Sequence, residues 1–402
     1  MKIVGLISEY NPFHNGHKYH IEKAREITGA DAVVVVMSGN FVQRGAPAIM
    51  PKHLRAEAAL KNGASLVIEL PVCYATGSAE FFAYGAVSLF DKLGCIDSIC
   101  FGSECGDIEI LQNLAKIIST EPKEYKTFLN QYLREGNSFP LARQKALKDY
   151  LQSDLADSVL AEPNNILGIE YLKALYKLNS KIKPYTIQRI SSNYHDKHLQ
   201  ETFSSASAIR REFSATAFEN IEKQIPDTTI SFMKEHYQTR YPVYTNDFSL
   251  LLKYKLLAET KSSLLEYADV SEELANRVLN NLNQFINYEQ YCELLKTKEV
   301  TYSRISRALL HVLLDIKKDA HTEIGYAHIL GFCKESNAVL SEIKKHSAIA
   351  LLSKLTTADT LSESAKKMLE NDIYSSNLYE SVITDKFKTV FKNEYSQQLI
   401  LI

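Results

Sequence analysis

Short runs rich in valine and isoleucine alternate with helical patterns over the first quarter of this 402-residue chain. The strand-like runs are 2–8, 32–37, 65–70 and 98–101, and the helical stretches between them are 17–28, 52–62 and 78–93. Each strand-like run is nearly continuous in apolar residues, which is typical of strands covered on both faces. The alternation predicts an α/β fold with a doubly wound parallel sheet.

The pattern changes in the second half of the chain. Residues 107–177 are mostly helical, and one further strand is expected at 184–190 before a short helix. Beyond about Ser214 we expect the strands to stop, because helical spacing dominates the rest of the chain. We therefore predict an α/β domain over 1–214 and an all-helical domain over 215–402.

Composition excludes several classes of protein. The charged fraction of 23% and the hydrophobic fraction of 45% are those of a folded protein. The longest apolar run, 32–37, is far shorter than the roughly 20 residues of a membrane span. The chain begins without a secretory signal pattern, so a cytoplasmic protein with no membrane partner is expected. The six cysteines are scattered, so neither a disulfide framework nor a metal site is predicted.

The most informative stretch is the loop from Glu9 to His17, which follows the first strand. Ligands of open α/β sheets bind at the carboxyl ends of the strands. His14 and His17 flank Gly16 at the start of a helix, where free N–H groups and the helix dipole favour phosphate. The commoner glycine-rich phosphate motifs do not occur here. The alternative is that both histidines only cap the turn.

The tetrapeptide HNGH, from His14 to His17, resembles the HIGH signature of the nucleotidyltransferase superfamily. In that superfamily the two histidines contact the α- and β-phosphates of ATP, which implies a catalytic role for His14 and His17. The two histidines are expected to stabilise the charge that develops when an oxygen of the acid substrate attacks the α-phosphorus.

The stretch SSASAIR, residues 204–210, is similar to the superfamily's second signature, ISSTxIR, with Ala206 and Ser207 as departures. The similarity implies phosphate contacts from Ser205, Ser207 and Arg210. The alternative is a serine-capped helix with a surface arginine.

Four further blocks resemble one family, the bacterial tRNA(Met) cytidine acetate ligases: EYNPF (9–13), MSGNFVQRG (37–45), FGSE (101–104) and PNNILG (163–168). That family makes acetyl-adenylate from acetate and ATP. It then transfers the acetyl group to the exocyclic amine of the wobble cytidine in elongator methionine tRNA, which gives N4-acetylcytidine. The resemblance covers most of 1–214 in blocks, so it implies that this domain has the Rossmann-like (HUP) nucleotidyltransferase fold and binds ATP. The rest matches only in size and helicity, and 215–402 is then the candidate for tRNA binding.

Carried onto this sequence, the resemblance implies an ATP site. Its members are Ile7, Ser8, Glu9, Tyr10, Asn11, Pro12, Phe13, His14, Asn15, Gly16, His17, Lys18, Tyr19, His20, Gly102, Asn164 and Arg189. Gly102 would contact adenine or ribose, Asn164 adenosine and Arg189 phosphate. The alternatives are a turn glycine, a helix cap and the partner of a carboxylate, in that order. Arg44 is a further candidate for phosphate, as are Lys52 and Arg55, for which a solvated helix face is the alternative.

The expected reaction needs positioning and charge stabilisation rather than a protein nucleophile, so no covalent acyl-enzyme is expected. Mg²⁺ is expected to accompany ATP, held by phosphate and water. The net charge of −2 argues against a protein whose whole surface carries nucleic-acid-binding charge, and no DNA partner is expected.

Two segments, 181–211 and 296–318, are locally basic. In the second, Arg304, Arg307 and His311 recur at helical spacing, which makes them candidates for tRNA contact or members of a solvated face. The competing functions are a small-molecule adenylyltransferase of coenzyme A or NAD synthesis, which is usually shorter, and a non-catalytic ATP-binding RNA adaptor.

Overall fold

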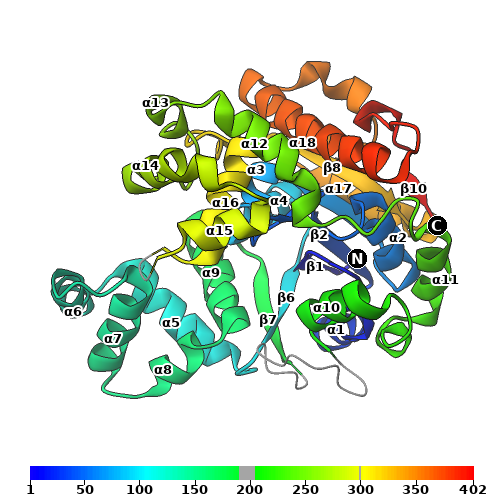
Figure 1. Cartoon of the computed structure of the whole chain (residues 1–402). Coiled ribbons are helices and arrows are strands. Elements are labelled where there is room, and N and C mark those ends of the chain that lie inside the picture. The colour runs from blue at the N-terminus through cyan, green and yellow to red at the C-terminus, as the bar shows by residue number, and fades with distance from the viewer. Residues whose placement is uncertain (190–203, 298–299) are drawn as a thin grey trace.

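A mixed sheet runs through the computed structural model, which describes residues 1–189, 204–297 and 300–402 (Figure 1). Its strand order is β10-β8-β5-β2-β1-β6-β7, with β9 paired to β8. The strands are β1 (Ile3–Ser8), β2 (Ala32–Ser38), β5 (Leu66–Leu70), β6 (Ser98–Ser103), β7 (Lys183–Gln188), β8 (Tyr326–Phe332), β9 (Ala350–Leu352) and β10 (Ile400–Leu401). All pairings in this sheet are parallel except that of β5 with β8, so the predicted α/β fold is confirmed.

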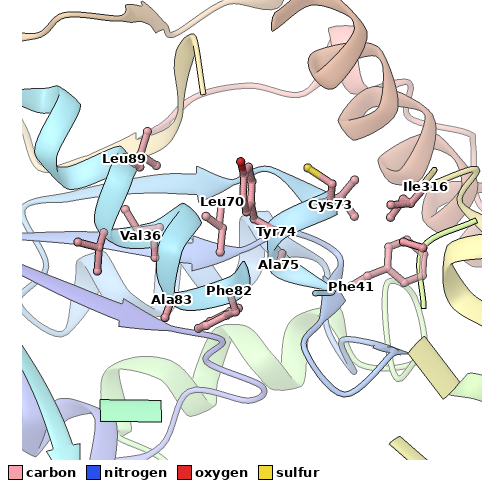
Figure 2. Packing of buried hydrophobic residues seen from close by; sticks show 14 of the residues in the cluster. Val36, Phe41, Leu70, Cys73, Tyr74, Ala75, Phe82, Ala83, Leu89 and Ile316 are labelled. Carbon is pink, nitrogen blue, oxygen red and sulfur yellow. The ribbon is translucent and has the colours of Figure 1, made fainter. Parts of the chain in front are cut away.

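The buried strands explain the two-sided packing. Every residue of β2, AVVVVMS, is buried, and successive side chains enter opposite cores. One core holds Val33 and Val35 with helices α1 (Asn15–Thr28), α2 (Lys52–Lys61), α10 (Ala206–Thr216) and α11 (Asp227–His236). The other holds Val34 and Val36 with α3 (Val72–Ala75), α4 (Ala79–Leu93) and α9 (Pro163–Leu178). Figure 2 shows Val36 and Leu70 in this second core.

A helical insertion joins β6 to α9 and projects from the body in Figure 1. It comprises α5 (Ile108–Thr120), α6 (Lys123–Arg134), α7 (Phe139–Leu151) and α8 (Leu155–Leu160). A two-stranded ribbon, β3 (Phe41–Val42) with β4 (Ala46–Pro47), follows β2 and lies outside the main sheet.

The second half of the chain is mainly helical. Its α-helices beyond α11 are α12 (Ser249–Leu257), α13 (Lys261–Leu264), α14 (Glu272–Asn281), α15 (Tyr288–Leu295), α16 (Tyr302–Leu313), α17 (Asn337–His346) and α18 (Glu363–Phe387). Short 3-10 helices lie at η1 (Glu222–Gln224), η2 (Thr245–Phe248), η3 (Leu282–Gln284), η4 (Lys334–Ser336), η5 (Leu355–Thr360) and η6 (Glu394–Ser396). In the described part of the chain, every helix is too short or too polar to cross a membrane.

The prediction that strands stop near Ser214 is wrong, because β8, β9 and β10 extend the sheet beyond β5. β8 is nearly all buried, and it pairs antiparallel with β5. A short apolar run cannot be told from a piece of buried helix by its periodicity alone. The second half of the chain is therefore joined to the first through a shared sheet.

Candidate active site

A cavity of about 450 Å³ opens at the carboxyl ends of β1, β6 and β7. We call it the strand-end pocket. It is lined by Ile7, Ser8, Glu9, Tyr10, Asn11, His14, Gly16, His17, Tyr19, His20, Gln43, Arg44, Ala79, Phe82, Phe101, Gly102, Pro163, Asn164, Ile166, Leu167, Tyr171, Ile187, Gln188, Arg189, Ser204, Ser205, Ala206, Ser207 and Arg210. The position agrees with the rule that open α/β sheets bind ligands at this edge.

His14 and His17 form a reciprocal cap at the start of α1. Nδ1 of His14 accepts a hydrogen bond from the Gly16 N–H at 3.1 Å, and Nδ1 of His17 accepts one from the His14 N–H at 3.3 Å. Their rings are stacked with centroids 3.7 Å apart. The capping alternative is thus what the structure shows, and both rings nevertheless line the pocket.

This cap determines the protonation of both rings. Because each Nδ1 accepts a hydrogen bond, the neutral ring carries its hydrogen on Nε2, which is then a donor. Burial, assisted by Arg189 and Arg210, lowers the pKa of His14 to about 3. Burial and the neighbouring His14 lower the pKa of His17 well below its usual value. At neutral pH the pair therefore offers two Nε2–H donors without a positive charge.

One turn further along α1, His20 also lines the pocket. Its Nε2 is buried and has no hydrogen-bond partner within the described residues. Burial lowers its pKa to about 4, although a hydrogen bond to the backbone of Cys100 opposes the shift. His20 is therefore a third neutral imidazole at this site.

The start of α10 closes another side of the pocket. Ser205 is the N-cap of this helix, and its hydroxyl accepts from the Ala208 N–H at 3.2 Å. Arg210 donates to the Asn11 carbonyl at 2.6 Å and to the Ser207 hydroxyl at 3.2 Å. Arg210 thus joins the second signature to the loop after β1, while its charge stays at the pocket.

The blocks FGSE and PNNILG meet at the opposite side. Asn164 donates from its amide to Glu104, and the Asn165 N–H donates to the same carboxylate at 2.9 Å. Buried Asn165 accepts in return from the Glu104 N–H at 2.9 Å. Arg189 lies 3.9 Å from Glu104, and a Cβ on Gly102 would be 3.3 Å from Cγ of Arg189. Gly102, Asn164 and Arg189, which the resemblance places in the ATP site, are therefore neighbours.

Four residues of the implied ATP site do not line the pocket: Pro12, Phe13, Asn15 and Lys18. Phe13 is buried in the core beneath α1. Asn15 donates to the Lys223 carbonyl at 2.8 Å, and Lys18 lies 4.0 Å from Glu22 on the outer side of the helix. These side chains shape or flank the loop.

Lys52 and Arg55 are both buried, and neither lines the strand-end pocket. Lys52 donates to Glu69 at 2.7 Å and pairs with Glu394 at 2.6 Å. Arg55 donates to main-chain carbonyls of both strand-end loops, including those of Glu9 and Ser38. The solvated-face alternative is therefore wrong for both cations, and their contribution of positive charge near the triphosphate stays a prediction.

The three candidates on α16 have different surroundings. Arg304 is exposed and makes no ion pair or side-chain hydrogen bond among the described residues. Arg307 donates to Asp269 at 2.9 Å. His311 is 1% exposed, and it lies within hydrogen-bond distance of Thr76 and the Ala268 carbonyl. Direct RNA contact by His311 is therefore excluded by burial, and Arg304 is the accessible member of the set.

Sequence reasoning missed several members of the pocket wall. Phe82 on α4 and Tyr171 on α9 both line it, as does Gln43 within the block MSGNFVQRG. The Tyr171 side chain is 3% exposed, and its hydroxyl has no hydrogen-bond partner within the described residues. The helical periodicity around Phe82 and Tyr171 predicts only that both face the core. Only the packing of α4 and α9 in the folded chain shows that they also line the pocket.

The arrangement suits a displacement at phosphorus without a protein nucleophile. Neutral imidazole N–H donors, the amino end of α1 and the guanidinium groups of Arg44, Arg189 and Arg210 surround one cavity. No cysteine is among the lining residues described. The lining includes one carboxylate, Glu9, so a Mg²⁺ ion would have few protein ligands and would depend on phosphate and water.

Comparisons with known proteins agree with this geometry. A family model described as HIGH Nucleotidyl Transferase matches residues 1–394. The tRNA(Met) cytidine acetate ligases of Clostridium perfringens and Acetivibrio thermocellus are 42% and 40% identical to the chain. The matches cover 94% and 100% of this chain and 95% and 100% of the relatives. Crystal structures of Thermotoga maritima TmcAL, apo and bound with alpha-thio ATP, match at 32% identity with TM-scores of 0.93 and 0.91, covering 100% of both chains.

Proposed function

The chain belongs to the HIGH nucleotidyltransferases and, among them, to the tRNA(Met) cytidine acetate ligases, and we propose from this premise that it acetylates tRNA. The enzyme is an ATP-dependent ligase that modifies tRNA(Met). In the first step acetate attacks the α-phosphorus of ATP, which gives acetyl-adenylate and pyrophosphate. In the second step the acetyl group passes to the wobble cytidine, and AMP leaves.

One observation carries the proposal for the site: the reciprocal cap of His14 and His17. It presents two neutral Nε2–H donors beside the amino end of α1. Hydrogen bonds preorganised toward developing charge are usually a large term in catalysis. We therefore place the triphosphate against this cap, with Arg44, Ser207 and Arg210 as further phosphate contacts.

The adenosine is proposed to lie toward Gly102 in β6 and Asn164 at the start of α9, and Arg189, which follows β7 beside them, is proposed as a phosphate contact. Mg²⁺ is proposed to enter with ATP, since phosphate and water supply most of its ligands. A thioester intermediate is not part of the proposal, because no cysteine is among the described lining residues of the strand-end pocket.

The division of labour along the chain is also a proposal. Residues 1–214 would form acetyl-adenylate, and residues 215–402 would bind tRNA, with Arg304 as the first candidate contact. Because tRNA is the acceptor, the place of action would be the cytoplasm. Neither DNA nor a membrane is among the proposed partners.

Incubation of the protein with labelled acetate, ATP and total bacterial tRNA tests the function. Digestion of the RNA should release labelled N4-acetylcytidine, and omission of ATP should abolish it. If no acetylcytidine forms while a phosphopantetheine or nicotinamide ester is adenylylated, the chain is a small-molecule adenylyltransferase instead. If ATP and tRNA bind without any turnover, it is an adaptor.

A further inference from the structure

Glu9 is the one acidic residue among the described lining of the strand-end pocket. It faces cationic groups from three elements, namely Arg44 after β3, Arg55 on α2 and Arg210 on α10. From α9 it faces Tyr171, whose pKa is raised by burial and, secondarily, by the charge of Glu9. A carboxylate in a pocket for a triphosphate is electrostatically adverse, so its presence needs a reason.

The first half-reaction needs no general base. Acetate is already ionised at neutral pH, so it loses no proton before it attacks phosphorus. In that step Glu9 can serve only as a ligand of Mg²⁺, since like-charge repulsion otherwise makes a second carboxylate beside acetate and three phosphates unfavourable. A role for Glu9 as a base therefore belongs to the second half-reaction.

The structure holds the Glu9 carboxylate in a fixed position. Its Oε1 accepts a hydrogen bond from the Gln43 N–H at 2.9 Å, and its main-chain carbonyl accepts one from Arg55. The next residue, Tyr10, has a φ of 47°, an uncommon backbone conformation for a residue with a side chain. The other carboxylate oxygen, Oε2, has no hydrogen-bond or ion-pair partner within the described residues, so it remains available to a ligand.

The second half-reaction requires a group that accepts a hydrogen bond and then a proton. The exocyclic amine of cytidine is a hydrogen-bond donor that carboxylates recognise. Its nitrogen forms a bond to the acetyl carbon, and the bond from that carbon to the AMP oxygen breaks. AMP takes the electron pair of that bond, and the nitrogen must lose one proton to give the amide.

Resting on the proposed function, we propose that Glu9 is the general base of acetyl transfer. Oε2 accepts a hydrogen bond from the amine of the wobble cytidine and takes the proton released when nitrogen attacks the acetyl carbon. Gln43 and Arg55 are positioning residues, since they hold this carboxylate and its loop. General bases of this kind typically contribute about 10²- to 10⁴-fold to rate.

The test compares the two half-reactions in the full-length enzyme. Acetate-dependent exchange of labelled pyrophosphate into ATP reports the first, and single-turnover transfer from preformed acetyl-adenylate to tRNA reports the second. Glu9→Gln should slow transfer by about a hundredfold more than it slows exchange. Glu9→Asp, which keeps a carboxylate, should retain part of the transfer rate.

Glu26→Gln is the matched control, because this carboxylate forms an exposed pair with Lys23 on α1 and does not line the pocket. It should leave the ratio of transfer to exchange as in the wild type. Equal losses in both half-reactions of Glu9→Gln would assign Glu9 to ATP or Mg²⁺ and overturn the proposal. A variant that keeps the wild-type rate in both half-reactions would overturn it as well. If the wild type shows neither exchange nor acetylcytidine, the proposed function itself fails.

Discussion

Gly45 lies so close to Arg307 that a Cβ atom added to Gly45 would be 2.3 Å from the backbone nitrogen of Arg307. The Ser306 hydroxyl donates to the Gly45 carbonyl at 2.8 Å across the same contact. Gly45 directly follows Arg44, which lines the strand-end pocket. The β3–β4 ribbon, whose turn holds Arg44, is therefore packed on the backbone of α16 in the second half of the chain.

Gly45→Ala should destabilise the protein by about 3 kcal/mol, because it combines a positive φ of 76° with a clash against backbone that cannot rotate away. Gly29→Ala is the matched control, since Gly29 has a φ of 61° and nothing within 4 Å of the added atom. Its cost should be about 1 kcal/mol. Urea unfolding followed by circular dichroism measures both, and equal losses would show that the contact with α16 is unimportant.

His17→Ala should lower acetate-dependent pyrophosphate exchange by about a hundredfold, because it removes one Nε2–H donor and one half of the cap. The exchange rate of the wild type should change little between pH 8 and pH 6.5, since both histidines act as neutral donors. Unchanged exchange in the variant would remove His17 from the catalytic group. A rate that requires an imidazolium would contradict the neutral pair.

Acid should destabilise the folded protein below about pH 6.5. Burial lowers the pKa of His14 to about 3 and those of His20, His53 and His321 to about 4. Below pH 6.5 the unfolded chain binds protons that these folded-state rings do not, so the free energy of unfolding falls by up to about 1.4 kcal/mol per pH unit for each ring. Asp372, whose pKa burial raises to about 8, contributes the opposite slope.

The net effect of these groups is a lower free energy of unfolding at pH 5.5 than at pH 7. Urea unfolding at the two pH values, with proton uptake on unfolding measured at pH 6, checks the sign. Equal or greater stability at pH 5.5 would show that the rings are not buried in neutral form.

Much of the sheet could be predicted because its strands carry an unmistakable local signal. The continuous apolar run of β2 follows from burial on both faces, and the loop after β1 contains its own motif. β8 could not be predicted, since its seven residues resemble any short apolar segment and its partner β5 is distant in the chain.

The site shows the same limit. Neither the burial of Lys52 nor its partner Glu394 can be read from the helix that carries it, because Glu394 arrives from the far end of the chain. Periodicity reports which side of a helix is apolar, and it does not report which cation will be paired inside. Tyr171 was missed for the same reason, since packing alone turns it toward the pocket.

Lys52→Met should destabilise the protein by about 3 to 5 kcal/mol. Burial alone disfavours the ammonium, but Glu394 and Glu69 outweigh it and raise the pKa of Lys52. Removing the cation leaves these two buried carboxylates without their partner. Lys23→Met, which breaks an exposed pair with Glu26, should leave the urea midpoint unchanged. Similar midpoints for both variants would mean that the buried network contributes no stability.

Arg304→Ala should weaken tRNA binding and reduce the slope of log affinity against log salt by about 1, because the exposed guanidinium of Arg304 is available to a phosphate. Arg307→Ala should instead lower the thermal midpoint, since Arg307 pairs with Asp269 beneath the surface. Lys344→Ala, an equal loss of charge on exposed α17, serves as the control for net charge. Binding measured by filter retention at several salt concentrations separates these effects. The same slope for Arg304→Ala and for the wild type would remove α16 from the tRNA interface, and the basic surface would then have to be sought elsewhere on the second half of the chain.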